Sequence, residues 1–212
     1  MKRDGGSVER LAVHEMGHVA VGHAQDLITV VDTRWSTQGF TFTAVDSESN
    51  WSDYDRKLRT IGAQVAVALG GGAAEVVVLG GLSPREIADL TFADVLDAGG
   101  TIDVQLAMEW LGLQRYDPSQ DSVETEVVEV FQAVAHELAR SANRETLRRL
   151  ARLFVRERGT LGRDVTVRFN GSGLEAACAA LELSASYPLR HTITPRVTAE
   201  TTTTSGRASE TP

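Results

Sequence analysis

Residues 7–25 read SVERLAVHEMGHVAVGHAQ, and this stretch decides the fold because it carries an HExxH sequence inside a helical pattern. Ser7 is a suitable N-cap, and Glu9 lies in the first turn. Residues four apart project from the same face of a helix, so the imidazoles of His14 and His18 would lie side by side. The sequence therefore predicts a helix that presents two imidazole nitrogens to one cation. The apolar packing residues are Leu11, Val13, Val19, Ala20 and Val21.

Two imidazoles and a carboxylate at this spacing indicate a catalytic zinc site. Neutral imidazole suits Zn²⁺, and a catalytic zinc keeps three protein ligands and an open position for water. Glu15 follows the first histidine, where a carboxylate can act as general base toward that water. An HExxH match arises by chance in roughly one chain of this length in a hundred, so its helical context carries weight. His23 falls off the ligand face, and we expect it on the solvent side.

A small residue lies between the two histidines. Gly17 lowers helix stability by about 1 kcal/mol relative to alanine. A glycine at this position leaves room for another backbone or a substrate to approach. The sequence therefore predicts room for a close approach beside this part of the helix.

The composition indicates one globular domain. The chain has 212 residues, 42% hydrophobic and 24% charged, which suffices for a proper core. Its formal net charge of −8 argues against nucleic acid or an anionic membrane surface as the main partner.

The single cysteine, Cys178, excludes an intramolecular disulfide. It stands among alanines and is typical of a small buried hydrophobic residue, which is consistent with a reducing, cytoplasmic setting.

The two ends differ from the middle of the chain. Residues 1–6 form a short polar lead without the apolar core of a signal peptide. Residues 186–212, rich in threonine, serine and proline, lack the apolar surface needed to fold and predict a disordered tail. The folded domain is therefore expected over residues 7–185. Its longest apolar run, residues 65–79, is interrupted by three glycines and Glu75, so it indicates a buried helix rather than a membrane span.

Periodicity predicts a mostly helical α+β fold, in which the HExxH helix packs with a small β element and a helical bundle. A turn is expected over residues 32–38, an exposed loop over 46–55, and a break near Ser141. Ser83, Pro84 and Glu86 form a strong helix-start signal. The predicted strands span 27–31, 39–43 and 165–169, and the further helices span 54–79, 84–98, 102–113, 123–157 and 174–183.

A third zinc ligand has to come from elsewhere in the chain. His136 is most simply a helix-surface residue and His191 lies in the predicted tail, which leaves the carboxylates. Glu75 stands in a row of small and aliphatic residues, where a charge is costly unless it is paired or lies near a metal. It either supports the metal site or lies on the wet side of its helix, and we favour the former.

Five stretches, in order, resemble the peptidase domain of the FtsH family of zinc metallopeptidases. The first is the HExxH helix, residues 11–23. The resemblance covers roughly residues 8–165, and ordered agreement over that span is more specific than HExxH alone. The other four are GFT at 39–41, VALGGGAAE at 67–75, GGTIDVQLA at 99–107, and residues 143–162.

The resemblance implies a zinc metalloendopeptidase in which His14, His18 and Asp103 bind the metal and Glu15 is the general base. Counting forward from Glu75 by the family's spacing reaches Asp89 instead, and Asp94 is a further alternative. Asp103 is preferred because Thr101 and the small residues before it match the family locally. An extra capped helix is also easily accommodated in the intervening connection.

The family usually carries a transmembrane segment and an ATPase module ahead of the peptidase part. Here thirteen residues precede His14, and no GxxxxGK[ST] stretch occurs in the sequence. We therefore expect the chain to cleave protein segments that are already unfolded or flexible, unless a separate ATPase or self-association delivers other substrates. The main alternative is a binding or regulatory protein that retains the zinc peptidase fold and cleaves nothing. A third hypothesis, a chance HExxH in a helical interaction module, predicts no bound metal.

Overall fold

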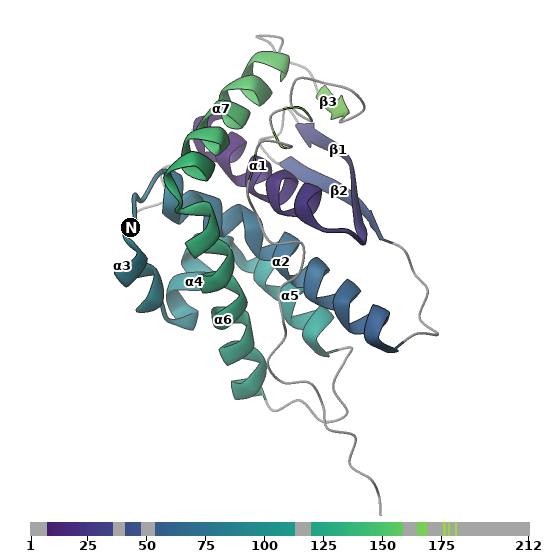
Figure 1. The fold of residues 1–212 in the computed structure, drawn as a ribbon, viewed down its shortest axis with the longest axis vertical. Coiled ribbons are helices and arrows are strands. Elements are labelled where there is room, and N and C mark those ends of the chain that lie inside the picture. The colour runs from purple at the N-terminus through teal and green to yellow at the C-terminus, as the bar shows by residue number, and fades with distance from the viewer. Residues whose placement is uncertain are drawn as a thin grey trace, which may run out of the picture.

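The computed structural model describes residues 8–35, 41–47, 54–112, 120–158 and 165–168, together with residues 176, 178 and 181. These parts form a mostly helical fold with a three-stranded sheet at one side (Figure 1), so the prediction of a mostly helical protein is confirmed. The helices are α1 (Val8–Ala24), α2 (Tyr54–Val78), α3 (Pro84–Ala88), α4 (Phe92–Gly99), α5 (Thr101–Gly112), α6 (Gln120–Leu138) and α7 (Ser141–Arg158). The strands are β1 (Ile28–Trp35), β2 (Thr41–Ser47) and β3 (Val165–Arg168).

Helix α2 is the core of the fold, and α1, α4, α5 and α6 all pack against it. Its side chains Ile61, Val65 and Leu69 are fully buried. By length and composition the segment Arg56–Val78 could cross a membrane, but 89% of its apolar window is buried inside the fold. The prediction of a buried helix over this apolar run is confirmed.

The sheet is antiparallel in the order β2-β1-β3, with β1 in the centre. The predicted turn at 32–38 is wrong at its start, because residues 32–35 continue β1. These residues pair on one side with β2 and on the other with β3. The pairing gives hydrogen-bond partners to backbone groups that a turn would leave without them. A register shift between Val30 and Asp32 marks an irregularity in the β1–β2 pairing. The predicted loop at 46–55 likewise overlaps the end of β2 and the start of α2.

The single helix predicted over 84–98 is also wrong, because two capping boxes divide it into α3 and α4. The first is the predicted box of Ser83 and Glu86. In the second, the Thr91 hydroxyl accepts a hydrogen bond from the Asp94 backbone N–H, and the Asp94 carboxylate accepts one from the Thr91 N–H. Gly100 follows α4 as its C-cap with a positive φ of 76°, and α5 starts at the next residue, Thr101.

The predicted break near Ser141 is confirmed, because α6 ends at Leu138 and α7 begins at Ser141. Of the helix predicted over 174–183, residues 176 and 178 are described as helical, and Cys178 is buried as expected. The predicted lead, residues 1–6, and tail, residues 186–212, lie outside the described residues.

Helices α1 and α2 cross at two glycines. A Cβ atom at Gly17 would collide with the carbonyl oxygen of Gly70 and lie 2.7 Å from the Ala74 Cβ. The backbone of α2 therefore occupies the space that the sequence left open beside the HExxH helix. This close approach brings the two histidines of α1 onto α2.

Gly17→Ala is expected to lower the free energy of unfolding by about 1–3 kcal/mol, because the methyl group meets backbone and the helices have to separate. Urea denaturation measures the loss. Gly112→Ala is the matched control, since nothing lies within 4 Å of a Cβ there and alanine favours a helix by up to about 1 kcal/mol. A Gly17→Ala protein as stable as the wild type would contradict this account of the crossing.

Candidate metal centre

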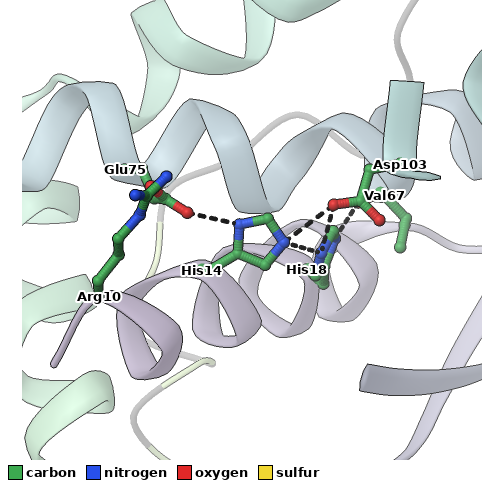
Figure 2. A network of polar contacts seen from close by, with 6 residues as sticks. All are labelled: Arg10, His14, His18, Val67, Glu75 and Asp103. Carbon is green, nitrogen blue, oxygen red and sulfur yellow. Dashed lines mark hydrogen bonds and ion pairs between the residues drawn. The ribbon is translucent and has the colours of Figure 1, made fainter. Parts of the chain in front are cut away.

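His14 and His18 of α1 and Asp103 of α5 come together beside α2, as Figure 2 shows. The two Nε2 atoms are 3.1 Å apart. Asp103 Oδ2 lies 2.9 Å from His14 Nε2 and 3.6 Å from His18 Nε2. The three residues expected to bind a metal thus place one nitrogen or oxygen each within 4.8 Å of one another.

The two rival aspartates lie elsewhere. Asp89 is exposed at the C-cap of α3, and Asp94 is exposed with its carboxylate engaged by Thr91. Neither belongs to the cluster with the histidines in the described part of the chain. His23 and His136 are exposed, as expected, and His191 lies outside the described residues.

Each imidazole is held by a hydrogen bond at its other nitrogen. His14 Nδ1 lies 2.8 Å from Glu75 Oε1, and His18 Nδ1 lies 2.7 Å from the backbone oxygen of Val67. With Nδ1 as donor in both rings, both Nε2 atoms are left to face Asp103. Such partners fix the ring orientation and raise the basicity of a metal-binding histidine.

Glu75 therefore supports His14, and its side chain is 12% exposed, so the wet-side alternative is wrong. The guanidinium of Arg10 pairs with Oε2 of Glu75 (Figure 2). This ion pair compensates the energetic cost of burying most of the Glu75 carboxylate. Arg10 was not among the residues predicted for the site. The available signal was its position four residues before His14, on the same face of α1.

Two members of the cluster, His14 and Asp103, have strongly shifted pKa values. Burial lowers the pKa of His14, but the hydrogen bonds that its ring makes to the carboxylates of Asp103 and Glu75 outweigh burial and raise that pKa to about 10. Burial raises the pKa of Asp103, but hydrogen bonds with both imidazoles hold it well below its usual range. At neutral pH the protein alone thus carries a protonated His14 beside an ionised Asp103. A cation at these atoms would displace the proton, so metal uptake should release it.

The donor set fits zinc. A tetrahedral Zn²⁺ lies about 2.0–2.1 Å from nitrogen or oxygen ligands, which places neighbouring ligand atoms about 3.3 Å apart. The separations of 2.9, 3.1 and 3.6 Å between the candidate ligand atoms lie on both sides of that value. Gly71 keeps the space at the imidazoles open, since a Cβ there would lie 2.6 Å from His18 Nε2 and 2.7 Å from His14 Nε2.

Glu15 is 2% exposed in the middle of α1. After burial and the hydrogen bonds already described, its negative charge also contributes to the raised pKa of His14. The Glu15 carboxylate therefore acts electrostatically on His14, one of the candidate ligands.

No protein-family model matches the chain, and a comparison with curated proteins gave no significant match.

Proposed function

We propose that this chain is a zinc-dependent metalloendopeptidase that hydrolyses peptide bonds in unfolded or flexible protein segments. The observation that carries the proposal is the convergence of His14, His18 and Asp103 at the spacing of three tetrahedral ligands. The position of Glu15 directly after the first ligand is the second support, because HExxH peptidases use that carboxylate as general base.

In the proposed mechanism zinc and the side chains of the protein have separate roles. Zinc would supply a Lewis acid for the scissile carbonyl and lower the pKa of a water molecule. Glu15 takes the proton of the attacking water and passes it to the leaving amine. Glu75 and the Val67 carbonyl keep both imidazoles aligned throughout.

The substrate and partners belong to the same proposal. Strand β2 lies at an edge of the sheet, where an extended peptide can add as a further strand. Such a peptide has to be unfolded already, so the substrates are flexible segments, or a separate ATPase or self-association delivers them. We propose a relative of the FtsH peptidase domain that works in the cytoplasm and binds neither nucleic acid nor a membrane.

Metal removal tests the function. Elemental analysis of the purified protein is expected to give one zinc per chain, and the protein should cleave fluorescently labelled, unfolded casein. A chelator should abolish cleavage, and stoichiometric zinc should restore it. A protein that holds zinc yet cleaves nothing over a broad substrate set would be a binding or regulatory protein. If the purified protein binds no metal, the HExxH sequence occurs in this chain by chance.

Asp103→Asn is expected to weaken zinc binding by about 100-fold or more, because changing even the outer partners of a zinc ligand costs 10–100-fold. Competition with a chromophoric chelator measures the affinity. Asp89→Asn and Asp94→Asn are matched controls, and both should bind zinc like the wild type because their carboxylates lie outside the cluster. Loss of zinc in either control, with Asp103→Asn unaffected, would assign the third ligand to that aspartate.

A further inference from the structure

Gly72 is the contact point between α2 and the corner that joins α4 to α5. A Cβ atom at Gly72 would collide with the Cα of Gly99 and lie 2.7 Å from its backbone nitrogen. The nearest remaining atom is the carbonyl carbon of Ala98, at 3.1 Å. All three contacts are to backbone, so no side-chain rotation could relieve them.

This corner determines where Asp103 lies. Gly99 ends α4, Gly100 turns the chain, and Asp103 stands in the first turn of α5. The Val104 N–H donates to the Gly100 carbonyl at 3.3 Å, and the Val104 side chain is fully buried. Asp103 is thus four residues from the backbone that rests on Gly72, within a short and well-anchored segment.

We propose that Gly72 is a positioning residue for the metal centre: it lets the α4–α5 corner lie directly on α2 and so brings Asp103 to His14 and His18. The inference rests on the proposed metal centre. The neighbouring glycines act differently, Gly70 at the α1 crossing and Gly71 at the imidazoles.

The distances explain why a methyl group here matters for the metal. Non-bonded carbon atoms pack at about 3.5–4.0 Å, so the corner would have to retreat by about 1 Å or more. Metal–ligand distances are tolerated only within about 0.2 Å of their ideal values. The carboxylate of Asp103 would leave the coordination sphere while His14 and His18 stay on α1.

Gly72→Ala is therefore expected to weaken zinc binding by about 10–100-fold, measured by chelator competition. The visible absorption of the Co²⁺-loaded protein should change as well, since it reports the ligand set. Gly112→Ala is the matched control, because it makes the same change at the far end of α5, where nothing lies within 4 Å of a Cβ. Its zinc affinity and Co²⁺ spectrum should remain those of the wild type.

A double-mutant cycle separates positioning from general destabilisation. In an Asp103→Asn background Gly72→Ala should cost no further zinc affinity, because the ligand that it displaces is already gone. Adding Asp103→Glu to Gly72→Ala should restore part of the affinity, since the longer side chain reaches back toward the histidines. A further loss in the Asp103→Asn background, or no rescue by glutamate, would overturn the inference.

If Gly72→Ala does not fold, Val104→Ala loosens the same corner without entering α2. Its zinc affinity should fall more than that of Val127→Ala, an equally buried valine on α6. Equal affinities in these two variants would overturn the inference. A wild-type protein that binds no zinc would remove the metal centre itself, whereas zinc binding unaffected by Gly72→Ala would remove only the role of Gly72.

Discussion

Replacing Glu15 by glutamine is expected to leave one zinc bound per chain and to lower the rate of casein cleavage by about 10²–10⁴-fold. Glutamine has nearly the shape of glutamate but cannot take a proton from water. The three candidate ligands, His14, His18 and Asp103, remain in place, so metal content should not change. Elemental analysis and a fluorescent casein assay on the same preparation measure both quantities.

Glu9→Gln is the matched control, because it makes the same change on the exposed first turn of the same helix. Its cleavage rate should equal that of the wild type. Undiminished cleavage by Glu15→Gln would assign the base to another group. A loss of zinc along with activity would instead make Glu15 part of the metal site's framework, and the proposed division of roles would be wrong.

The HExxH helix could be predicted because its information is local. The spacing of His14 and His18 determines their common face, and Gly17 between them predicted room for a close approach. What approaches Gly17 is the backbone of Gly70, 53 positions away, and periodicity contains no information about such a pair. The same holds for the pairing of β1 with β3, which joins residues more than 120 positions apart.

The third ligand shows where sequence reasoning reaches its limit. Counting along the chain left Asp89, Asp94 and Asp103 open, because the length of a connection does not reveal how it folds. Two capped helices occupy the connection, and one cap uses Asp94. Thr91 and Asp94 have the three-residue spacing of a capping box, so that role was readable from the sequence. The contact of Gly72 with Gly99, which brings Asp103 into place, was not.

Gly71→Ala is expected to lower zinc affinity by about 100-fold or more while the protein remains folded. The added methyl group would lie 2.6 Å from His18 Nε2 and 2.7 Å from His14 Nε2, where both imidazoles face their ligand position. The rings can turn away, so α2 need not move, and alanine itself favours a helix. Turning them breaks their hydrogen bonds to Glu75 and the Val67 carbonyl, and each such partner is worth 10–100-fold in metal affinity.

Chelator competition measures the affinity of Gly71→Ala, and thermal unfolding of the metal-free protein shows whether the fold persists. Gly22→Ala is the matched control, because it adds a methyl group to α1 that meets only side chains, the nearest being Val30 Cγ2 at 2.8 Å. It should change stability without changing zinc affinity. Wild-type affinity in Gly71→Ala would mean that the metal does not occupy the space beside these imidazoles, and the centre would have to be placed elsewhere. A loss of zinc affinity in Gly71→Ala that Gly22→Ala does not share would tie Gly71 to the metal itself.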